Sequence, residues 1–134
     1  TNRMTGFVGG AGGGIGYGGL PGWSLEVDTF FNNYDPTEED HLSLHIDGDA
    51  SNPVAVAVLP ELEDGEWHEL ELVARGQDMT VTVDGTVYLD LSSPQLTAFP
   101  AFVGFTGATG SSHNAHLIDG LRVEGSICEG GGTR

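Results

Sequence analysis

Residues 26–36 read Glu-Val-Asp-Thr-Phe-Phe-Asn-Asn-Tyr-Asp-Pro, and a histidine follows at position 41. In an extended strand, side chains two positions apart leave the same face of the sheet, so Glu26 and Asp28 are expected side by side. Carboxylates about 4 Å apart repel by roughly 4 kcal/mol at an effective dielectric constant of 20. From the loop that follows, Asn32, Asp35 and His41 can fold back over them. A bound divalent cation would relieve the repulsion.

The donor types in this stretch suit two kinds of cation. Carboxylates, an amide and a backbone carbonyl are the oxygen ligands that calcium prefers, at about 2.3–2.6 Å. An imidazole beside shared carboxylates suits a transition ion such as manganese or zinc. The stretch therefore predicts Ca²⁺ and, beside it, Mn²⁺ or another transition metal.

The order Glu-x-Asp-x-aromatic-x-Asn, followed by Asp-Pro and a histidine, resembles the metal-binding segment of bacterial L-type (legume-type) lectins, members of the concanavalin A-like superfamily. The resemblance implies that calcium is held by Asp28, the Phe30 carbonyl, Asn32 and Asp35. It implies that the transition metal is held by Glu26, Asp28, Asp35 and His41. The last two of these residues are one position further apart here than in the plant pattern.

A glycine-rich stretch, residues 9–22, precedes the acidic strand. Its Gly14, Gly16 and Gly19 have the spacing of a dinucleotide-binding loop. No strand is predicted before them, and Pro21 follows where a helix should begin, so a dinucleotide site is excluded.

Within the same stretch, Ile-Gly-Tyr-Gly-Gly at 15–19 is similar to a loop beside the sugar site of bacterial L-type lectins. The resemblance implies that Gly18 or Gly19 donates a backbone N–H to a sugar, because glycine lets the backbone approach a ligand closely. A flexible entry loop without a binding role is the alternative.

A run near the end, Val-Gly-Phe-Thr-Gly-Ala-Thr-Gly at 103–110 followed by His116, closely matches the late L-type lectin motif. In that family the loop helps to set sugar specificity, which makes candidates of the residues that follow it: Ser111, Ser112, His113 and Asn114. A shallow sugar site needs an aromatic face and fixed hydrogen-bonding groups. Phe30 is the candidate face and Asn32 the candidate amide. The alternative is that Phe30 and Phe31 both lie in the core.

The chain is predicted to be all-β, a concanavalin A-like jelly-roll sandwich of antiparallel strands. Apolar and polar residues alternate in several short runs, which is typical of half-buried strands. Asp84-Gly85 is a strong hairpin signal, and Asp47-Gly48 predicts another turn. The predicted strands span residues 25–30, 42–46, 54–59, 67–74, 79–83, 87–91, 101–105 and 116–123.

The length of the chain indicates the number of domains, and its net charge excludes some classes of binding partner. The 134 residues fit one domain, expected to be an L-type lectin-like domain over 1–124 with a disordered tail at 125–134. The net charge of −16 argues against nucleic acid and against anionic membrane surfaces. It fits a secreted or cell-surface protein that captures cations, although solubility alone can explain many of the acids. The lone Cys128 fits either an intermolecular bridge or a free thiol.

Sandwiches of this kind commonly run ~200–250 residues as one domain. The family's early strands, with an aspartate that receives sugar hydroxyls, have no counterpart in residues 1–6. The chain is therefore expected to be a fragment, one chain of a two-chain lectin, or a shortened module. A second chain or a homo-oligomer would then cover the exposed strand edges.

The predicted function is a calcium-dependent carbohydrate-binding module. Retaining glucanases share the sandwich and use a Glu-x-Asp-x-x-Glu strand with carboxyl groups about 5–5.5 Å apart. Glu26 and Asp28 fit its beginning, but Phe31 stands where the second glutamate should be, so hydrolysis is excluded. The alternative is a calcium-stabilised adhesion or structural module that binds no sugar.

Overall fold

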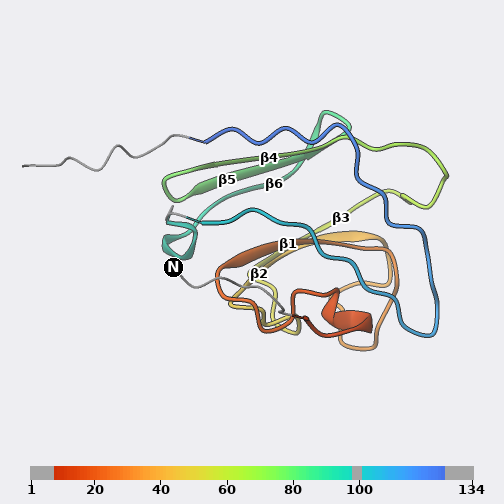
Figure 1. The fold of residues 1–134 in the computed structure, drawn as a ribbon. Helices are drawn as coiled ribbons and strands as arrows, with labels where there is room; N and C mark the ends of the chain where they lie inside the picture. Colours follow the sequence, from red (N-terminus) through yellow and green to blue (C-terminus); the bar gives the residue numbers. More distant parts are fainter. Residues whose placement is uncertain (1–7, 98–100, 126–134) are drawn as a thin grey trace, which may run out of the picture.

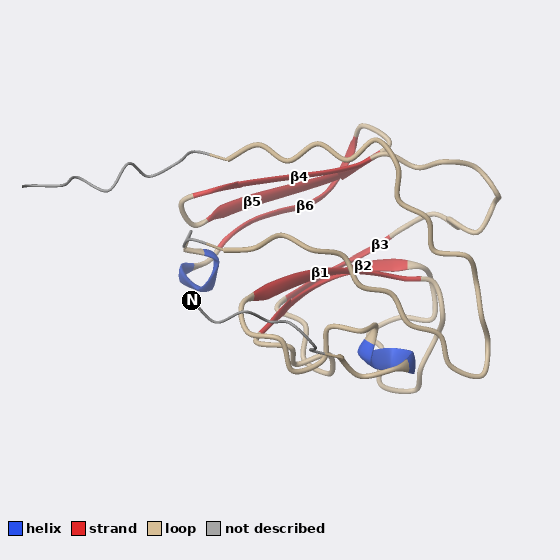
Figure 2. Cartoon of the chain, in the orientation of Figure 1, coloured by secondary structure: helices blue, strands red, loops and turns tan. Residues whose placement is uncertain are grey.

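The computed structural model describes residues 8–97 and 101–125, and within them the chain forms two antiparallel sheets. The sheets have the strand orders β1-β2-β3 and β4-β5-β6 and lie one above the other (Figure 1), with two short 3-10 helices at the periphery (Figure 2). The elements are η1 (Gly12–Gly14), β1 (Trp23–Asp28), β2 (His41–Ile46), β3 (Ala55–Val58), β4 (Leu70–Arg75), β5 (Asp78–Val83), β6 (Thr86–Ser92) and η2 (Pro94–Leu96). This arrangement confirms the predicted all-β sandwich.

The core fills the space between the sheets. Leu42 and Leu44 alternate with polar residues on β2, and both are fully buried. They belong to one apolar cluster with Met79 and Val81 of β5. Its remaining buried members are Leu59, Val83, Leu89 and Leu96. Burying each large aliphatic side chain contributes about 1.5–3 kcal/mol.

The outer face of the β1–β2 pair is polar and is nevertheless largely buried. Strand pairing places Asp28 opposite His41, Glu26 opposite Ser43, and Ser24 opposite His45. All of these except Ser24 are at most 6% exposed. The glycine-rich stretch supplies part of their cover, because its Tyr17 is buried against Glu26.

The β5–β6 connection confirms the hairpin predicted at Asp84-Gly85. Both residues have positive φ, 49° and 76°, as a type I′ turn requires. Aspartate, like asparagine, tolerates the left-handed conformation, and glycine adopts it readily because it has no side chain. A register irregularity at Val81/Thr82 interrupts the ladder between the two strands.

Two of the predicted strands, residues 101–105 and 116–123, are wrong. No strand occurs in the described segment 101–125, and almost every residue in it is exposed, including Phe102 at 84% and Leu117 at 71%. The alternation of apolar residues is present, but a strand also needs a backbone ladder with a neighbour. Gly104, Gly107 and Gly110 further weaken the propensity of the first half of the segment for extended pairing.

The predicted strand 67–74 is shorter and less buried than expected. It begins at Leu70, as β4, and only Leu72 packs against the core. β4 is also an edge strand of its sheet, so one of its sides has no neighbouring strand among the described residues. Residues 126–134 of the predicted tail, with Cys128, lie outside the described residues. In the part of the chain that is described, no helix has the length and apolarity to cross a membrane.

The core assignment gives a stability prediction. Leu44→Ala should lower the free energy of unfolding by about 2–5 kcal/mol, because it leaves a cavity at a fully buried position. Urea titration followed by circular dichroism measures the loss. Val87→Ala, at a position 55% exposed, is the control and should change stability by less than about 1 kcal/mol. Equal losses in the two variants would contradict the assignment.

Candidate functional site

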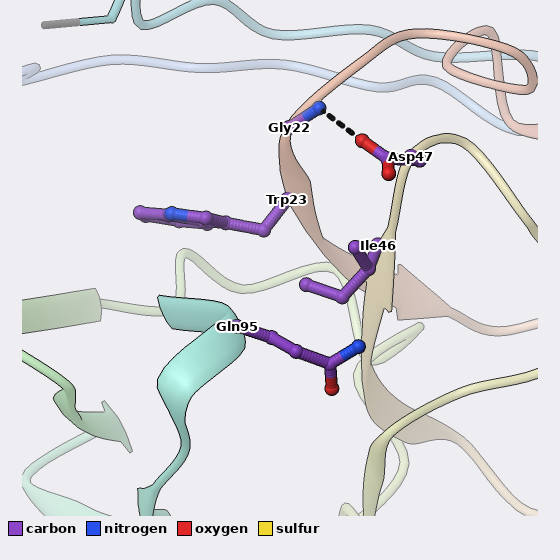
Figure 3. A pocket seen from close by; sticks show the side chains of 5 residues that line it. All are labelled: Gly22, Trp23, Ile46, Asp47 and Gln95. Atoms are coloured by element: carbon purple, nitrogen blue, oxygen red, sulfur yellow. Dashed lines mark hydrogen bonds between the residues drawn. The ribbon is translucent and has the colours of Figure 1, made fainter. Parts of the chain in front are cut away.

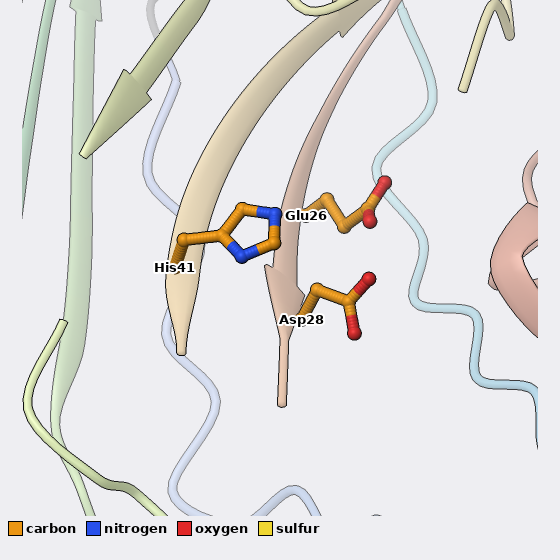
Figure 4. Close-up of side chains that lie close together, drawn as sticks. All are labelled: Glu26, Asp28 and His41. Carbon is orange, nitrogen blue, oxygen red and sulfur yellow. The ribbon is translucent and has the colours of Figure 1, made fainter. Parts of the chain in front are cut away.

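Three buried ionisable side chains meet at one end of the β1–β2 pair. Glu26, Asp28 and His41 each offer a ligand atom, and these atoms all lie within 4.8 Å of one another. Figure 4 shows the two carboxylates leaving β1 on the same side, with the imidazole reaching toward them from β2. Period-two alternation places the carboxylates together, and antiparallel pairing places His41 directly across from Asp28. We refer to these three residues as the acid–histidine trio.

The Asp28 carboxylate is only half satisfied. Its Oδ1 accepts a hydrogen bond from the Phe30 backbone N–H at 2.8 Å. Its Oδ2 is buried and has no partner among the described residues. The Ser24 hydroxyl oxygen is also buried without a partner, but a neutral hydroxyl is less costly to bury than a carboxylate oxygen. The unpaired Asp28 oxygen therefore fits a site for a cation.

Hydrogen bonds distinguish the two buried histidines. His41 Nδ1 lies 3.0 Å from the Glu39 carbonyl and must donate to it, which leaves the lone pair of Nε2 free. His45 Nδ1 likewise donates to the Asp49 carbonyl at 2.8 Å. Its Nε2 lies 2.7 Å from the Ser43 hydroxyl, from which it accepts. His41 thus has the tautomer and the free nitrogen that a metal ligand needs, whereas both nitrogens of His45 are already engaged.

Glu26 is held in a proton-binding environment. Burial is the main reason that the pKa of Glu26 rises to about 7, and the Asp28 carboxylate adds to the rise. The Tyr17 hydroxyl donates a hydrogen bond to Glu26 Oε2, and this bond alone acts in the opposite direction. A positive charge beside Glu26 would favour the carboxylate form.

The residues predicted for calcium are close to one another but lie partly outside the trio. Asn32 donates its backbone N–H to Asp35 Oδ2. Its side-chain amide donates to the Phe30 carbonyl at 3.3 Å. Asp35 does not belong to the group of ligand atoms that meet within 4.8 Å. The loop therefore gathers the predicted calcium ligands, which here hydrogen-bond to one another.

Three loops that are distant in sequence meet beside the trio. The Thr106 hydroxyl donates to the Ile15 carbonyl at 2.8 Å, which joins the late loop to the glycine-rich stretch. A side chain on Gly13 would come within 1.7 Å of the Tyr34 hydroxyl, which joins the same stretch to the loop after β1. Gly13 is therefore needed for the close approach of these two loops.

The predicted sugar-contacting residues divide into two groups. Gly18 and Gly19 already donate their N–H groups inside the chain, to the carbonyls of Gly14 and Gly48. Asn114 donates its amide to Glu63 at 2.6 Å, which joins it to the acidic loop before β4. The remaining candidates of the late loop, Ser111, Ser112 and His113, are exposed.

The aromatic residues after β1 also face solvent. Phe30 is 52% exposed and Phe31 42%, so the alternative that both lie in the core is wrong. Tyr34 is 54% exposed in the same loop. The loop therefore presents aromatic surface close to the trio.

The sequence reasoning did not find the network around Glu26. In the sequence Tyr17 stands out only as part of a glycine-rich run, yet it is the one buried residue in 8–20. Ser43 and His45 share the outer face of β2 with His41, as the alternation of apolar and polar residues in 42–46 predicts. What the sequence did not reveal is that a loop covers this face.

A separate hollow of about 400 Å³ lies at the opposite end of β1 (Figure 3). Its lining includes Trp23, Ile46 and Gln95, and Asp47 accepts a hydrogen bond from the Gly22 N–H at 3.0 Å beside it. Trp23 packs against the core. The hollow has none of the trio's unpaired buried charge, so the trio is the stronger functional candidate.

The contact of Gly13 with Tyr34 gives a matched test of loop packing. Gly13→Ala should lower the free energy of unfolding by about 1–3 kcal/mol, because the new methyl group displaces Tyr34. Gly14→Ala is the control, since a methyl group there meets nothing within 4 Å. Hydrogen exchange of residues 30–36 should accelerate in the first variant only. Equal exchange in both variants would show that the two loops are not in contact.

Comparison with known proteins identifies the family of the chain. The family model described as Laminin G domain matches residues 37–121, more than half of the chain. The match includes His41 and the late loop but begins after Glu26 and Asp28. No solved structure matches the chain. Laminin G domains are jelly-roll modules of extracellular or cell-surface proteins that bind ligands and commonly Ca²⁺, and they are not typically enzymes. The chain belongs to the laminin G domain family.

Proposed function

We propose that this chain is a divalent-cation-dependent carbohydrate-binding module that acts in a secreted or cell-surface protein. The observation that carries the proposal is the unpaired, buried Oδ2 of Asp28 within the acid–histidine trio. A buried carboxylate without a partner is costly, and a coordinated cation is one of the ways in which proteins compensate it. The cation would neutralise the trio and fix the end of β1, from which the aromatic loop departs.

The donor set fits a transition ion best. Glu26 and Asp28 offer carboxylate oxygens, and His41 offers the free nitrogen of a histidine whose other nitrogen is hydrogen-bonded to a carbonyl. Manganese and zinc accept this mixture of oxygen and nitrogen ligands. We further propose that Ca²⁺ is held next to it by Asp28, Asn32, Asp35 and the Phe30 carbonyl, whose oxygens suit a hard cation.

The recognition surface is proposed to be the aromatic loop with the late loop. Phe30 and Tyr34 are exposed beside the trio, and an aromatic face can stack on the C–H surface of a pyranose. The Asn32 amide uses one N–H on the Phe30 carbonyl and retains a second for a hydroxyl. Ser111, Ser112 and His113 are exposed and can add polar contacts. The similarity of these loops to L-type lectins supports a sugar ligand.

A cation-stabilised adhesion or structural module without sugar binding is the second candidate. Two observations favour it: Gly18 and Gly19 have no free N–H, and Asn114 is bonded to Glu63. In either case a second chain or a homo-oligomer is proposed to cover the exposed apolar residues of the edge strands. A glycan array with and without EDTA separates the two functions, because only the lectin loses glycan binding when the cation is removed.

Removal of the cation gives the first functional prediction. In saturating metal, EDTA should lower the melting temperature by roughly 10 °C, since a ligand at 100 times its dissociation constant contributes about 2.7 kcal/mol. Asp28→Asn should abolish this response, because the amide keeps the bond from Phe30 but loses the charge. Asp90→Asn, on an exposed position of β6, should respond like the wild type. A metal-insensitive wild type would refute the cation site.

Removal of the Phe30 side chain gives the second functional prediction. Phe30→Ala should reduce glycan affinity at least about tenfold while leaving metal binding intact, because the side chain is exposed and only its carbonyl is a proposed ligand. Trp67→Ala is the control, since Trp67 is 66% exposed in a different loop, before β4. Affinities are measured by titration calorimetry with a glycan that the array identifies. Unchanged affinity in the Phe30 variant would show that sugar does not stack there.

A further inference from the structure

Tyr17 connects the glycine-rich stretch to the trio through a single hydrogen bond. It is 5% exposed, and its hydroxyl donates to Glu26 Oε2. The centroid of its ring lies 5.7 Å from that of the His45 ring, and the two rings are tilted against each other. Burial raises the pKa of the Tyr17 hydroxyl, so the group remains a proton donor at neutral pH.

His45 approaches the same oxygen but does not compete for it. Its Nε2 lies 3.4 Å from Glu26 Oε2. That nitrogen accepts from Ser43, because Nδ1 must carry the proton given to the Asp49 carbonyl. Burial lowers the pKa of His45 and so keeps the ring neutral. Among the described residues, Tyr17 is therefore the hydrogen-bond donor to Glu26.

The occupied oxygen limits how Glu26 can bind a cation. With one lone pair of Oε2 taken by Tyr17, Oε1 is the oxygen of Glu26 with no hydrogen bond among the described residues and the better placed of the two to coordinate. Calcium collects six to eight oxygens and often takes carboxylates through both. Zinc needs only four ligands and accepts a carboxylate through one oxygen beside an imidazole.

We propose that Tyr17 is a specificity-determining residue of the acid–histidine trio: by hydrogen-bonding to Glu26 Oε2, it favours coordination through Oε1 alone and makes the trio select Zn²⁺ over Ca²⁺. Tyr17 touches no cation itself and acts by positioning Glu26. This inference rests on the proposed function, because it assumes that the trio holds a cation.

The test compares Zn²⁺ and Ca²⁺ binding in the wild type, Tyr17→Phe and Tyr88→Phe. Tyr17→Phe keeps the aromatic ring beside His45 and removes only the hydroxyl that donates to Glu26. The ratio of the Ca²⁺ to the Zn²⁺ dissociation constant at the trio should fall at least about tenfold, as expected for loss of a hydrogen bond to a charged group. Tyr88→Phe removes a hydroxyl from β6, in the other sheet, and should leave the ratio unchanged. Asp35→Asn in all three backgrounds weakens the proposed calcium set, which shares Asp28 with the trio, so that the measured Ca²⁺ binding reports on the trio.

A spectroscopic readout distinguishes positioning from a general loss of structure. Co²⁺ substitutes for zinc, and its visible absorption weakens as the coordination number rises. Tyr17→Phe should weaken the absorption, because Glu26 gains a second ligand oxygen, while far-UV circular dichroism stays unchanged. A crystal structure of the zinc-loaded wild type needs no variant and should show Glu26 bound through Oε1 alone, with Oε2 on Tyr17.

The outcomes separate the inference from the proposed function. If the wild type binds neither Zn²⁺ nor Ca²⁺, the cation site itself is wrong and the inference fails with it. If the wild type binds Zn²⁺ but the ratio and the Co²⁺ spectrum are the same in Tyr17→Phe, only the role of Tyr17 is overturned. Glu26 bound to zinc through both oxygens in the wild type would overturn it as well.

Discussion

Burial of negative charge on the outer face of one sheet is the constraint on which the rest of this structure depends. Glu26 and Asp28 lie beneath a loop with exposed fractions of 6% and 5%, and the Asp28 Oδ2 has no partner within the described chain. Placing such groups out of water costs several kcal/mol unless they are paired, protonated or metal-bound. Glu26 has a donor in Tyr17, and His41 faces both carboxylates with a free nitrogen.

The cover over these charges also builds the surface beside them. The glycine-rich stretch brings Tyr17 onto Glu26 and, a few residues earlier, makes room at Gly13 for Tyr34. The late loop is tied to the same stretch through Thr106. A change at the trio can therefore reach exposed residues of two other loops through short, specific contacts. The proposed link between cation binding and ligand recognition rests on this continuity.

Membership of the laminin G family agrees with this architecture and leaves the ligand open. The family match covers both sheets from β2 onward, which accounts for the sandwich and its core. It does not cover Glu26, Asp28 or Tyr17. Most residues of the proposed metal site thus lie in the segment before the match, where resemblance to L-type lectins supplied the hypothesis.

The sequence by itself determined the all-β class, the hairpin at Asp84-Gly85 and the pairing of Glu26 with Asp28 on one face, because each follows from local rules of alternation and turn conformation. It did not determine whether the alternating residues 101–105 and 116–123 form strands, since that depends on a ladder with a distant neighbour. Nor did it reveal that Gly18 and Gly19 donate their backbone N–H groups to carbonyls within the chain, or that the Tyr17 hydroxyl donates to Glu26. Tertiary structure decided these points, because a hydrogen bond between remote segments depends on where the whole chain places them, and no local pattern records that position.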